Sequence, residues 1–395
     1  MLNPRLALLT DYTFRRLASL LEGREPPPGL APIDLSIGSP MHEVPTLLTE
    51  TLAAHGHLWN RYPQVVGTAE FRAAVAQWLA RRYGLPAELL EPERHILPVA
   101  GTKEALFMIA QVLLPEAKAG QRPAILMPNP FYNVYLGGAV MAGAEPVLLA
   151  TSPATGHLPD LDALPASLLE RTVAFFLCSP ANPQGAAASL AYLGRALDLA
   201  RAHDFVLIAD ECYSEIWTRE PPPGALQAAA GRGVERLLVF NSLSKRSSAA
   251  GLRSGFVAGD PDLIAAFARI RNYAAAVQPL PVLAAASALW RDETHVAANR
   301  ALYQGKHRLA NARLGGRFGH EEPDGGFFLW LNAGDGEVAT LRLWSEAGLK
   351  VLPGAYLGRP DASGHNPGSA WIRIALVHDL ATTDAALDRL VATLG

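Results

Sequence analysis

The sequence predicts an α/β protein: a large three-layer domain around a mostly parallel sheet, and a smaller α+β domain built from N-terminal and C-terminal segments. Three observations lead to this prediction. The chain has 395 residues and half of them are hydrophobic, which is enough for a sizeable core. In the middle of the chain, short apolar runs alternate with helical stretches. In the last third, a long helical stretch precedes three strand-like runs.

The apolar runs in the middle of the chain are predicted to be strands. They are continuous rather than alternating, which indicates that helices cover both faces of the sheet and that the sheet is mostly parallel. The predicted strands are 124–127, 146–149, 173–178, 205–209, 237–240 and 255–258.

Helical periodicity accounts for most of the segments around these strands. The predicted helices are 45–54, 68–83, 103–113, 132–141 and 190–202. In the second of them, Phe71, Val75 and Trp78 fall on one face. Thr68 is its expected N-cap and Gly84 its expected C-cap.

The two ends of the chain differ from the middle. The first 45 residues are predicted to be an irregular, proline-rich arm. A helix over 292–311 and strands at 327–331, 350–352 and 371–376 suit the smaller domain. We therefore expect 1–45 to form the arm and part of the small domain, 46–284 the large domain, and 285–395 the rest of the small domain.

Charge and composition exclude several classes of protein. The 34 Lys and Arg residues nearly balance the 37 Asp and Glu residues, so neither nucleic acid nor an anionic membrane is an expected partner. The N-terminus lacks a signal-peptide pattern, and the most membrane-like stretch, 274–290, is short and contains prolines. We expect a cytoplasmic protein.

The histidines show no metal-ligand spacing, so no metal site is predicted. Cys178 and Cys212 are expected to be reduced and structural.

Two polar motifs directly follow predicted strands. Asp210 lies at the carboxyl end of a strand, where open α/β sheets bind ligands, although a helix cap or a structural ion pair is the plainer alternative. Lys245 follows the next strand, beside Ser242 and Ser244. A lone lysine there is usually on the surface, but one at a dry sheet edge can become a nucleophilic amine. Arg253, eight residues further on, can hold a phosphate bidentately.

Two weaker motifs point to the same edge of the sheet. Gly101 and Thr102 open a predicted helix, whose free N–H groups suit an anion. Asn182 precedes a proline at the end of a strand and can aim its amide into a crevice, although a plain turn explains it equally well.

Together with Tyr132 and Tyr213, these residues form an ordered series with characteristic spacing. Asp210 follows Asn182 by 28 residues, and Lys245 follows Asp210 by 35. The series resembles the fold-type I pyridoxal-phosphate (PLP) enzymes of the class I/II aminotransferase group. The resemblance covers nearly the whole chain and implies amino acid and 2-oxo acid substrates.

A narrower resemblance is to the proteobacterial succinyldiaminopimelate aminotransferases. It rests on the strings at 34–40, 128–135, 210–216, 242–247, 295–303 and 366–368. It implies transfer of an amino group from glutamate to the 2-oxo precursor of N-succinyl-LL-2,6-diaminopimelate, in lysine biosynthesis. The sequence departs from that family at Ser39, where the family usually has Glu, which leaves the exact amino acceptor open.

The class resemblance implies three catalytic residues, Lys245, Asp210 and Tyr213. Lys245 is expected to bond to the cofactor's aldehyde and to move the proton at the substrate Cα. Asp210 is expected to keep the ring nitrogen protonated. Asn182 and Tyr213 are expected to bind the ring oxygen, and Tyr132 to stack on the ring.

The resemblance also implies a phosphate site, a substrate site and a dimer. The expected phosphate ligands are Gly101, Thr102, Lys103, Ser242, Ser244 and Arg253. Tyr62 resembles a tyrosine that reaches the phosphate from the other subunit, which implies a homodimer with shared active sites. Arg373 is expected to bind the substrate α-carboxylate, helped by Gly38 and Asn182.

Other functions remain open at this stage. Within the same fold, the chain could be an aminotransferase for aspartate, alanine or an aromatic amino acid, or a lyase. A sensor module would need a DNA-binding segment, and no basic helix-turn-helix pattern is present. The residue that binds the substrate's far end is also open, with Arg16, Arg24 and Arg359 as candidates.

Overall fold

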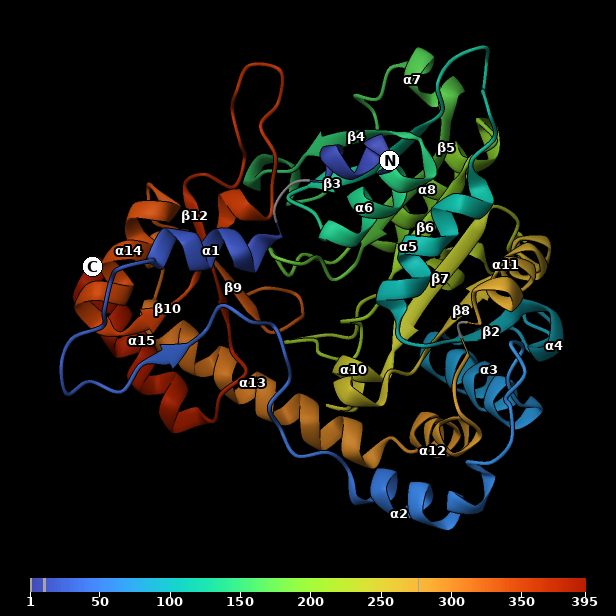
Figure 1. Ribbon diagram of the computed structural model, residues 1–395, viewed down its shortest axis with the longest axis horizontal. Coiled ribbons are helices and arrows are strands. Elements are labelled where there is room, and N and C mark those ends of the chain that lie inside the picture. Colours follow the sequence, from blue (N-terminus) through green and yellow to red (C-terminus); the bar gives the residue numbers. More distant parts are fainter. Residues whose placement is uncertain (1, 10–11, 276) are drawn as a thin grey trace.

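The large domain is built on a seven-stranded sheet. The computed structural model describes residues 2–9, 12–275 and 277–395 and confirms the α/β prediction (Figure 1). The strand order is β2 (Ile96–Val99), β8 (Gly255–Gly259), β7 (Leu237–Ser242), β6 (Val206–Asp210), β5 (Thr172–Cys178), β3 (Ala124–Asn129) and β4 (Glu145–Ala150). The strands from β7 to β4 are parallel, whereas β8 runs antiparallel to both of its neighbours.

Helices cover both faces of this sheet and make three layers. One face packs against α3 (Ala69–Tyr83), α8 (Leu190–Ala202), α9 (Ala225–Ala229) and α12 (Leu280–Arg291). The other packs against α5 (Thr102–Leu113), α6 (Asn133–Ala142) and α11 (Pro261–Ala274). Consecutive residues of β6, Leu207 and Ile208, belong to the two different cores, because successive side chains of a strand point to opposite faces.

The caps predicted for α3 are confirmed. The Thr68 hydroxyl accepts a hydrogen bond from the Phe71 N–H at 3.2 Å, and Gly84 ends the helix in the left-handed conformation. The Trp78 ring of α3 lies 4.7 Å from that of Trp290 in α12. The remaining short helices of this domain are α2 (Thr46–Ala54), α4 (Pro92–His95), α7 (Ala166–Arg171) and α10 (Leu243–Arg246).

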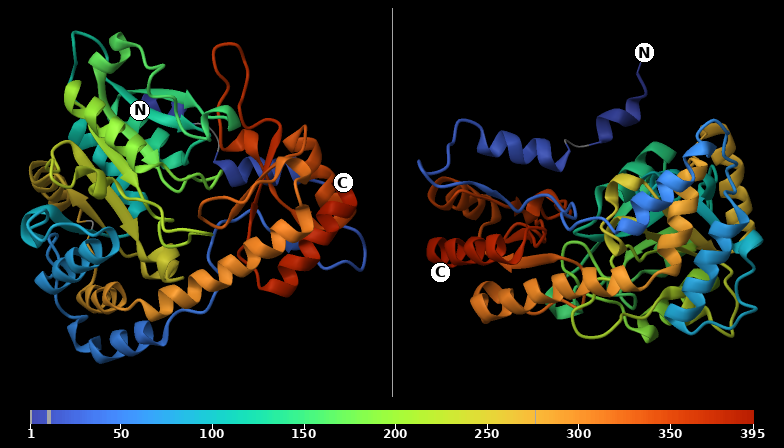
Figure 2. Two further views of the ribbon diagram at one scale, coloured as in Figure 1. Left: turned by 180° about the vertical axis from the view of Figure 1, so that it is seen from behind. Right: turned by 90° about the horizontal axis from the view of Figure 1, so that it is seen from below.

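The small domain combines segments from both ends of the chain (Figures 1 and 2). Its antiparallel sheet has the order β11 (Leu352–Pro353), β12 (Trp371–Ala375), β9 (Phe328–Asn332). Three helices pack on it: α13 (Thr294–Leu314), α14 (Gly336–Ala347) and α15 (Leu380–Leu394). The N-terminal strand β1 (Ile33–Asp34) pairs in parallel with β10 (Leu349–Lys350). The long α13 runs from the large domain into the small one (Figure 1).

The prediction that the first 45 residues are irregular is wrong over α1 (Thr13–Leu21). Leu17 and Leu21 of this helix are buried against Trp330 and Leu352 of the small domain. The helix has only nine residues and depends on a distant part of the chain for its apolar contacts, so local periodicity gave little signal.

Strand β2 was not predicted from the sequence. It contains Pro98, which cannot donate a backbone hydrogen bond and is tolerated because β2 is an edge strand that pairs only with β8. In the apolar stretch 274–290, residue 274 ends α11 and residues 280–290 make up nearly all of α12. No helix in the part of the chain that the structure describes is long and apolar enough to cross a membrane.

Candidate functional site

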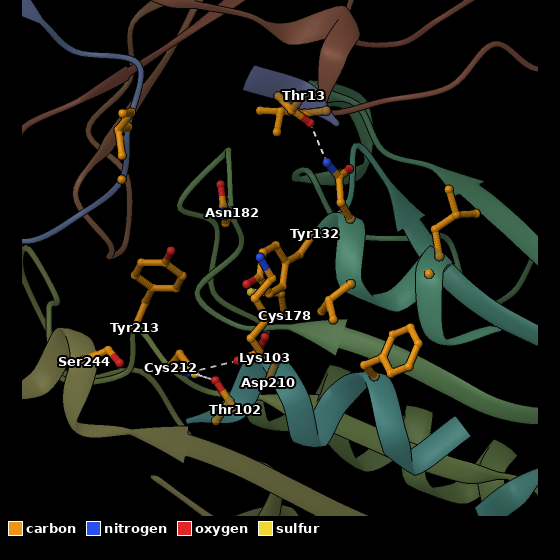
Figure 3. Close-up of a pocket in the computed structure, with 18 of the residues that line it drawn as sticks. Thr13, Thr102, Lys103, Tyr132, Cys178, Asn182, Asp210, Cys212, Tyr213 and Ser244 are labelled. Carbon is orange, nitrogen blue, oxygen red and sulfur yellow. Dashed lines mark hydrogen bonds between the residues drawn. The ribbon is translucent and has the colours of Figure 1, made fainter. Parts of the chain in front are cut away.

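A cavity of about 740 Å³ lies between the two domains, at the carboxyl ends of β5, β6 and β7 (Figure 3). Most of the site residues predicted from the sequence line this cavity. They are Gly38, Thr102, Lys103, Tyr132, Asn182, Asp210, Tyr213, Ser242, Ser244, Lys245, Arg253 and Arg373. Parallel strands bring their carboxyl ends to one edge, which explains why residues scattered over the chain meet here.

Asp210 is the last residue of β6 and is buried at the floor of the cavity. One of its oxygens accepts a hydrogen bond from the Tyr135 hydroxyl at 2.6 Å, and the other accepts one from the Cys212 N–H at 3.3 Å. Burial raises the pKa of Asp210, whereas these hydrogen bonds and the nearby Lys245 charge act in the opposite direction. A cation placed against this carboxyl would therefore be held strongly.

Lys245 projects from α10 into the cavity. Its Nζ donates to the Gly38 carbonyl at 2.7 Å and lies 4.9 Å from the centre of the Phe327 ring. Burial, together with the positive charges of Arg373 and Arg253, lowers the pKa of Lys245 to about 8. At pH 7, roughly a tenth of the amine is then neutral and nucleophilic, far more than for a free lysine.

The start of α5 lies beside Arg253. Gly101 precedes the helix with a φ of +82°, and the first N–H groups of the helix have no partner within it. A Cβ added to Gly101 would lie 2.2 Å from Nη2 of Arg253, so only glycine lets the guanidinium come this close. Gly101 itself is not among the lining residues, whereas its neighbours Thr102 and Arg253 are.

Ser242 and Ser244 complete this end of the cavity. The Ser242 hydroxyl lies 2.8 Å from that of Ser244 and accepts the Ser244 N–H at 3.0 Å. Arg253 is held through its backbone, because its carbonyl accepts a hydrogen bond from Nε2 of Gln278 at 2.9 Å. Lys103 is exposed, with its Nζ 5.4 Å from the centre of the Tyr12 ring.

Arg373 enters the cavity from the middle of β12. Its guanidinium donates to the Ser36 carbonyl at 2.7 Å and to Oδ1 of Asn182 at 3.1 Å, and it faces the Phe328 ring. Its buried Nε has no hydrogen-bond partner among the described residues. Burial lowers the pKa of Arg373 to about 10.

Two tyrosines and an asparagine form the cavity wall. Tyr132, at the start of α6, meets the Tyr135 ring edge-on at 5.7 Å. The Tyr213 ring meets the Phe327 and Phe328 rings edge-on, at 5.5 and 5.8 Å. Burial raises the pKa of both Tyr132 and Tyr213, so their hydroxyls stay protonated and can donate hydrogen bonds. Figure 3 shows Asn182, Tyr132, Tyr213 and Asp210 reaching toward one space from different elements.

Some of the site residues predicted from the sequence do not line the cavity. The Tyr62 side chain is fully exposed and lines no part of the cavity, so its predicted role needs a second subunit. Ser39 is exposed beside the lining residue Gly38. Among the candidates for the far end of the substrate, Arg359 lines the cavity, whereas Arg16 and Arg24 do not.

Three supporting residues were missed from the sequence. Tyr135 holds Asp210, and Gln278 holds the Val99 and Arg253 carbonyls. Asn299 of α13 donates to the carbonyls of Lys245 and Arg246 at 3.0 and 3.2 Å. The string 128–135 contains Tyr132 and Tyr135, but nothing local marks which of them reaches the carboxylate.

The two cysteines are buried beside Asp210. The Cys212 Sγ lies 3.2 Å from the Thr102 hydroxyl, and Cys178 donates to the Pro180 carbonyl. Burial and the neighbouring Asp210 raise the pKa of both thiols. Both cysteines are free, which agrees with the reduced state expected from the sequence.

Charge is unbalanced around the cavity. Its described lining residues include the cations Lys103, Lys245, Arg253, Arg359 and Arg373 but a single acid, Asp210.

A family model for class I and II aminotransferases matches residues 31–390. The chain belongs to the class I and II aminotransferases.

Known proteins agree over the full length of the chain. An aminotransferase structure from Neisseria meningitidis is 40% identical, with a TM-score of 0.93 and coverage of 100% of both chains. An LL-diaminopimelate aminotransferase of Moorella thermoacetica is 32% identical, covering 99% of this chain and 98% of the relative. A 4-dedimethylamino-4-oxo-anhydrotetracycline transaminase of Streptomyces rimosus, OxyQ, is also 32% identical, covering 92% and 94%. The fold-type I and class I/II predictions are confirmed.

Aminotransferases of this class depend on PLP, and the residues present suit that cofactor. The Lys245 amine, whose pKa is lowered, suits the aldehyde of the cofactor. The buried carboxyl of Asp210 suits its ring nitrogen. The close approach of Gly101 to Arg253 leaves the guanidinium and the helix N-terminus side by side, which suits a phosphate.

Replacing Gly101 with alanine should damage this phosphate site. The Cβ would collide with Arg253, and the φ of +82° would be strained. We expect the affinity for PLP to fall at least tenfold, measured by titrating the apoprotein and following cofactor absorbance. Gly251→Ala, where a Cβ would meet no atom within 4 Å, is the control. Equal affinities for the two variants would contradict this assignment.

Replacing Lys245 with methionine should change how the stability of the apoprotein depends on pH. The folded-state pKa, about 8, lies below the ordinary 10.5, so the unfolded chain binds more protons between these values and wild-type stability rises with pH there. The free energy of unfolding of Lys245→Met does not include this titration. We therefore expect the stability of Lys245→Met, relative to that of wild type, to be higher at pH 7 than at pH 9.5.

The measurement is urea unfolding of both apoproteins from pH 7 to 9.5, with exposed Lys103→Met as the matched control. A stability difference between Lys245→Met and wild type that stays constant with pH would show that the amine is not desolvated.

Proposed function

We propose that this aminotransferase moves the amino group of glutamate to the 2-oxo precursor of N-succinyl-LL-2,6-diaminopimelate, in diaminopimelate and lysine biosynthesis. The observation that carries the proposal is the excess of cations over acids around Lys245, which suits substrates with more than one carboxylate. The motif strings, such as 128–135 and 242–247, support the succinylated substrate.

The second candidate is diaminopimelate without a succinyl group. It is favoured by the names of several relatives, which are LL-diaminopimelate aminotransferases at 28–32% identity. Since OxyQ acts on a tetracycline intermediate by its name and is as similar as the Moorella relative, overall identity does not choose the substrate.

In the proposed reaction, each residue acts through its own chemistry. Lys245 would hold the cofactor covalently until substrate displaces it, and its freed Nζ would then take the proton from the substrate Cα. Its lowered pKa keeps part of the amine neutral and able to accept that proton near neutral pH. PLP supplies the electron-accepting ring. Asp210, with Tyr135 behind it, would keep the ring nitrogen positively charged.

The other residues would orient the substrate and the cofactor. Arg373 would bind the α-carboxylate through its planar fork, and its unpartnered Nε adds a further donor. Tyr213 and Asn182 would hold the ring oxygen, while Tyr132 covers the ring face. A Cβ on Gly38 would lie 2.5 Å from the Phe328 ring, so only glycine fits here. Without a side chain at this position, the backbone would stay accessible to the substrate carboxylate.

We also propose a homodimer in which Tyr62 completes the neighbouring subunit's phosphate site. Tyr62 is fully exposed, and further large apolar side chains are exposed nearby in the sequence at Val44, Trp59 and Val66. Exposed apolar residues at this density mark an interaction surface.

Half-reactions test the substrate. Glutamate added to the holoenzyme should convert the cofactor absorbance to that of the amine form, and the succinylated 2-oxo acid should reverse it at least tenfold faster than the compound without succinate. Lys245→Ala should do neither, because it lacks the amine. Conversion by glutamate without reversal by the succinylated acid would reject this substrate and leave the family intact.

Tyr62→Phe tests the shared site. We expect PLP to bind about tenfold more weakly, because one hydrogen bond to a charged group is lost. Light scattering should show a dimer for both proteins. A wild-type monomer with full PLP affinity would overturn the proposal, and Tyr273→Phe, at another exposed tyrosine, is the control.

A further inference from the structure

The string 295–303, which has no part in the mechanism proposed above, lies on α13 and contacts the loop that carries Lys245. Nδ2 of Asn299 donates to the Lys245 carbonyl at 3.0 Å, and Nε2 of His295 lies 2.8 Å from the Ser247 hydroxyl. Neither Asn299 nor His295 is among the residues that line the cavity. This part of α13 therefore supports the lysine through its loop and not through the substrate.

A segment from the N-terminal part of the chain meets α13 at the same place. It carries Gly38, whose carbonyl accepts Nζ of Lys245 at 2.7 Å. Four residues further on, Nδ1 of His42 lies 2.7 Å from Oδ1 of Asn299. The Ser248 hydroxyl also donates to the His42 carbonyl at 2.8 Å. His42 thus joins the segment that touches the amine of Lys245 to the helix that holds its backbone.

The hydrogen bonds around His42 have one consistent direction. Nζ of Lys306, also on α13, lies 2.6 Å from Nε2 of His42, and a charged amine can only donate. On the other side of the ring, Asn299 uses its Nδ2 to donate to backbone carbonyls, so its Oδ1 accepts from Nδ1 of His42. The imidazole therefore carries its proton on Nδ1, accepts at Nε2 and is uncharged.

The surroundings of His42 favour this uncharged form. Burial lowers the pKa of His42, as does the charge of Lys306, whereas the bond to Asn299 acts in the opposite direction. Burial also lowers the pKa of Lys306 to about 8, and Asp379 before α15 opposes this change. The Tyr303 ring lies 4.4 Å from the His42 ring. A second proton on the imidazole would place two positive charges 2.6 Å apart.

We infer that His42 is a positioning residue that holds Lys245 in its desolvated, reactive state. His42 does not line the cavity, so it acts through its neighbours. Its segment keeps Gly38 against the amine, and its bond to Asn299 supports the carbonyl of the lysine. Both contacts restrict the access of water to the amine. The inference rests on the role proposed for Lys245 but not on which substrate the enzyme uses.

The experiment measures the pKa of Lys245 in the full-length apoprotein. Acetic anhydride reacts with the neutral amine, so mass spectrometry of the peptide that contains Lys245 gives a pH midpoint for labelling. The wild-type midpoint should be about 8. His42→Phe keeps an aromatic ring beside Tyr303 but removes both ring nitrogens. It should raise the midpoint by at least one pH unit toward the ordinary 10.5, because water reaches the amine once the segment is released.

His320→Phe is the matched control. Nε2 of His320 lies 2.8 Å from Oδ1 of Asn311, which is also on α13, and neither residue lines the cavity. This variant loses the same kind of bond and should keep the wild-type midpoint. His42→Asn has an amide that can still donate to Asn299, so its midpoint should rise less than that of His42→Phe.

An unchanged midpoint in His42→Phe would overturn the inference, as would equal shifts in His42→Phe and His320→Phe. If His42→Phe does not fold, the milder pair His42→Asn and His320→Asn decides by the same criterion, with a rise expected only in the first. Failure of the proposed function looks different: wild-type protein would form no covalent bond with PLP through Lys245, and the labelling comparison would still decide the role of His42.

Discussion

An excess of positive charge on buried side chains is the constraint on which this site depends. Desolvation penalises every charge there, and the penalty appears as lowered pKa values for Lys245 and Arg373. Anionic ligands relieve the repulsion. The proposed affinity for a phosphate and for carboxylates and the proposed reactivity of the amine therefore have one physical origin.

The same cavity joins distant parts of the chain. Lys245 reaches the carbonyl of Gly38 in the N-terminal segment, and Arg373 of β12 reaches Asn182 in the loop after β5. The Thr13 hydroxyl of α1 donates to the Tyr356 carbonyl, and Asn133 of α6 donates to Thr13, as Figure 3 shows. The site is thus a major part of what fixes the two domains relative to each other.

Sequence patterns predicted the parts of the site that follow from strand ends. Asp210 and Lys245 could be predicted because continuous apolar strands locate the edge of a parallel sheet. Tyr135 and Asn299 could not, because each acts through one tertiary hydrogen bond and helical periodicity gives no sign of it.

The same limit applies to the fold. The caps of α3 are local chemistry and were predictable, whereas α1 gains its apolar contacts only from the assembled small domain. The role proposed for Tyr62 involves a second chain, and it could be assigned only by resemblance. The domain boundaries stay predictions, and α12, which crosses residue 284, packs with α3 on the large domain.

The buried thiols have a practical consequence for spectroscopy. Because Cys178 and Cys212 are buried and their pKa values are raised, we expect maleimide dyes to react with them only slowly in the folded protein. A pair of cysteines introduced on the surface, one on each domain, can therefore carry fluorophores for single-molecule distance measurements. The two natural cysteines beside Asp210 do not first have to be replaced.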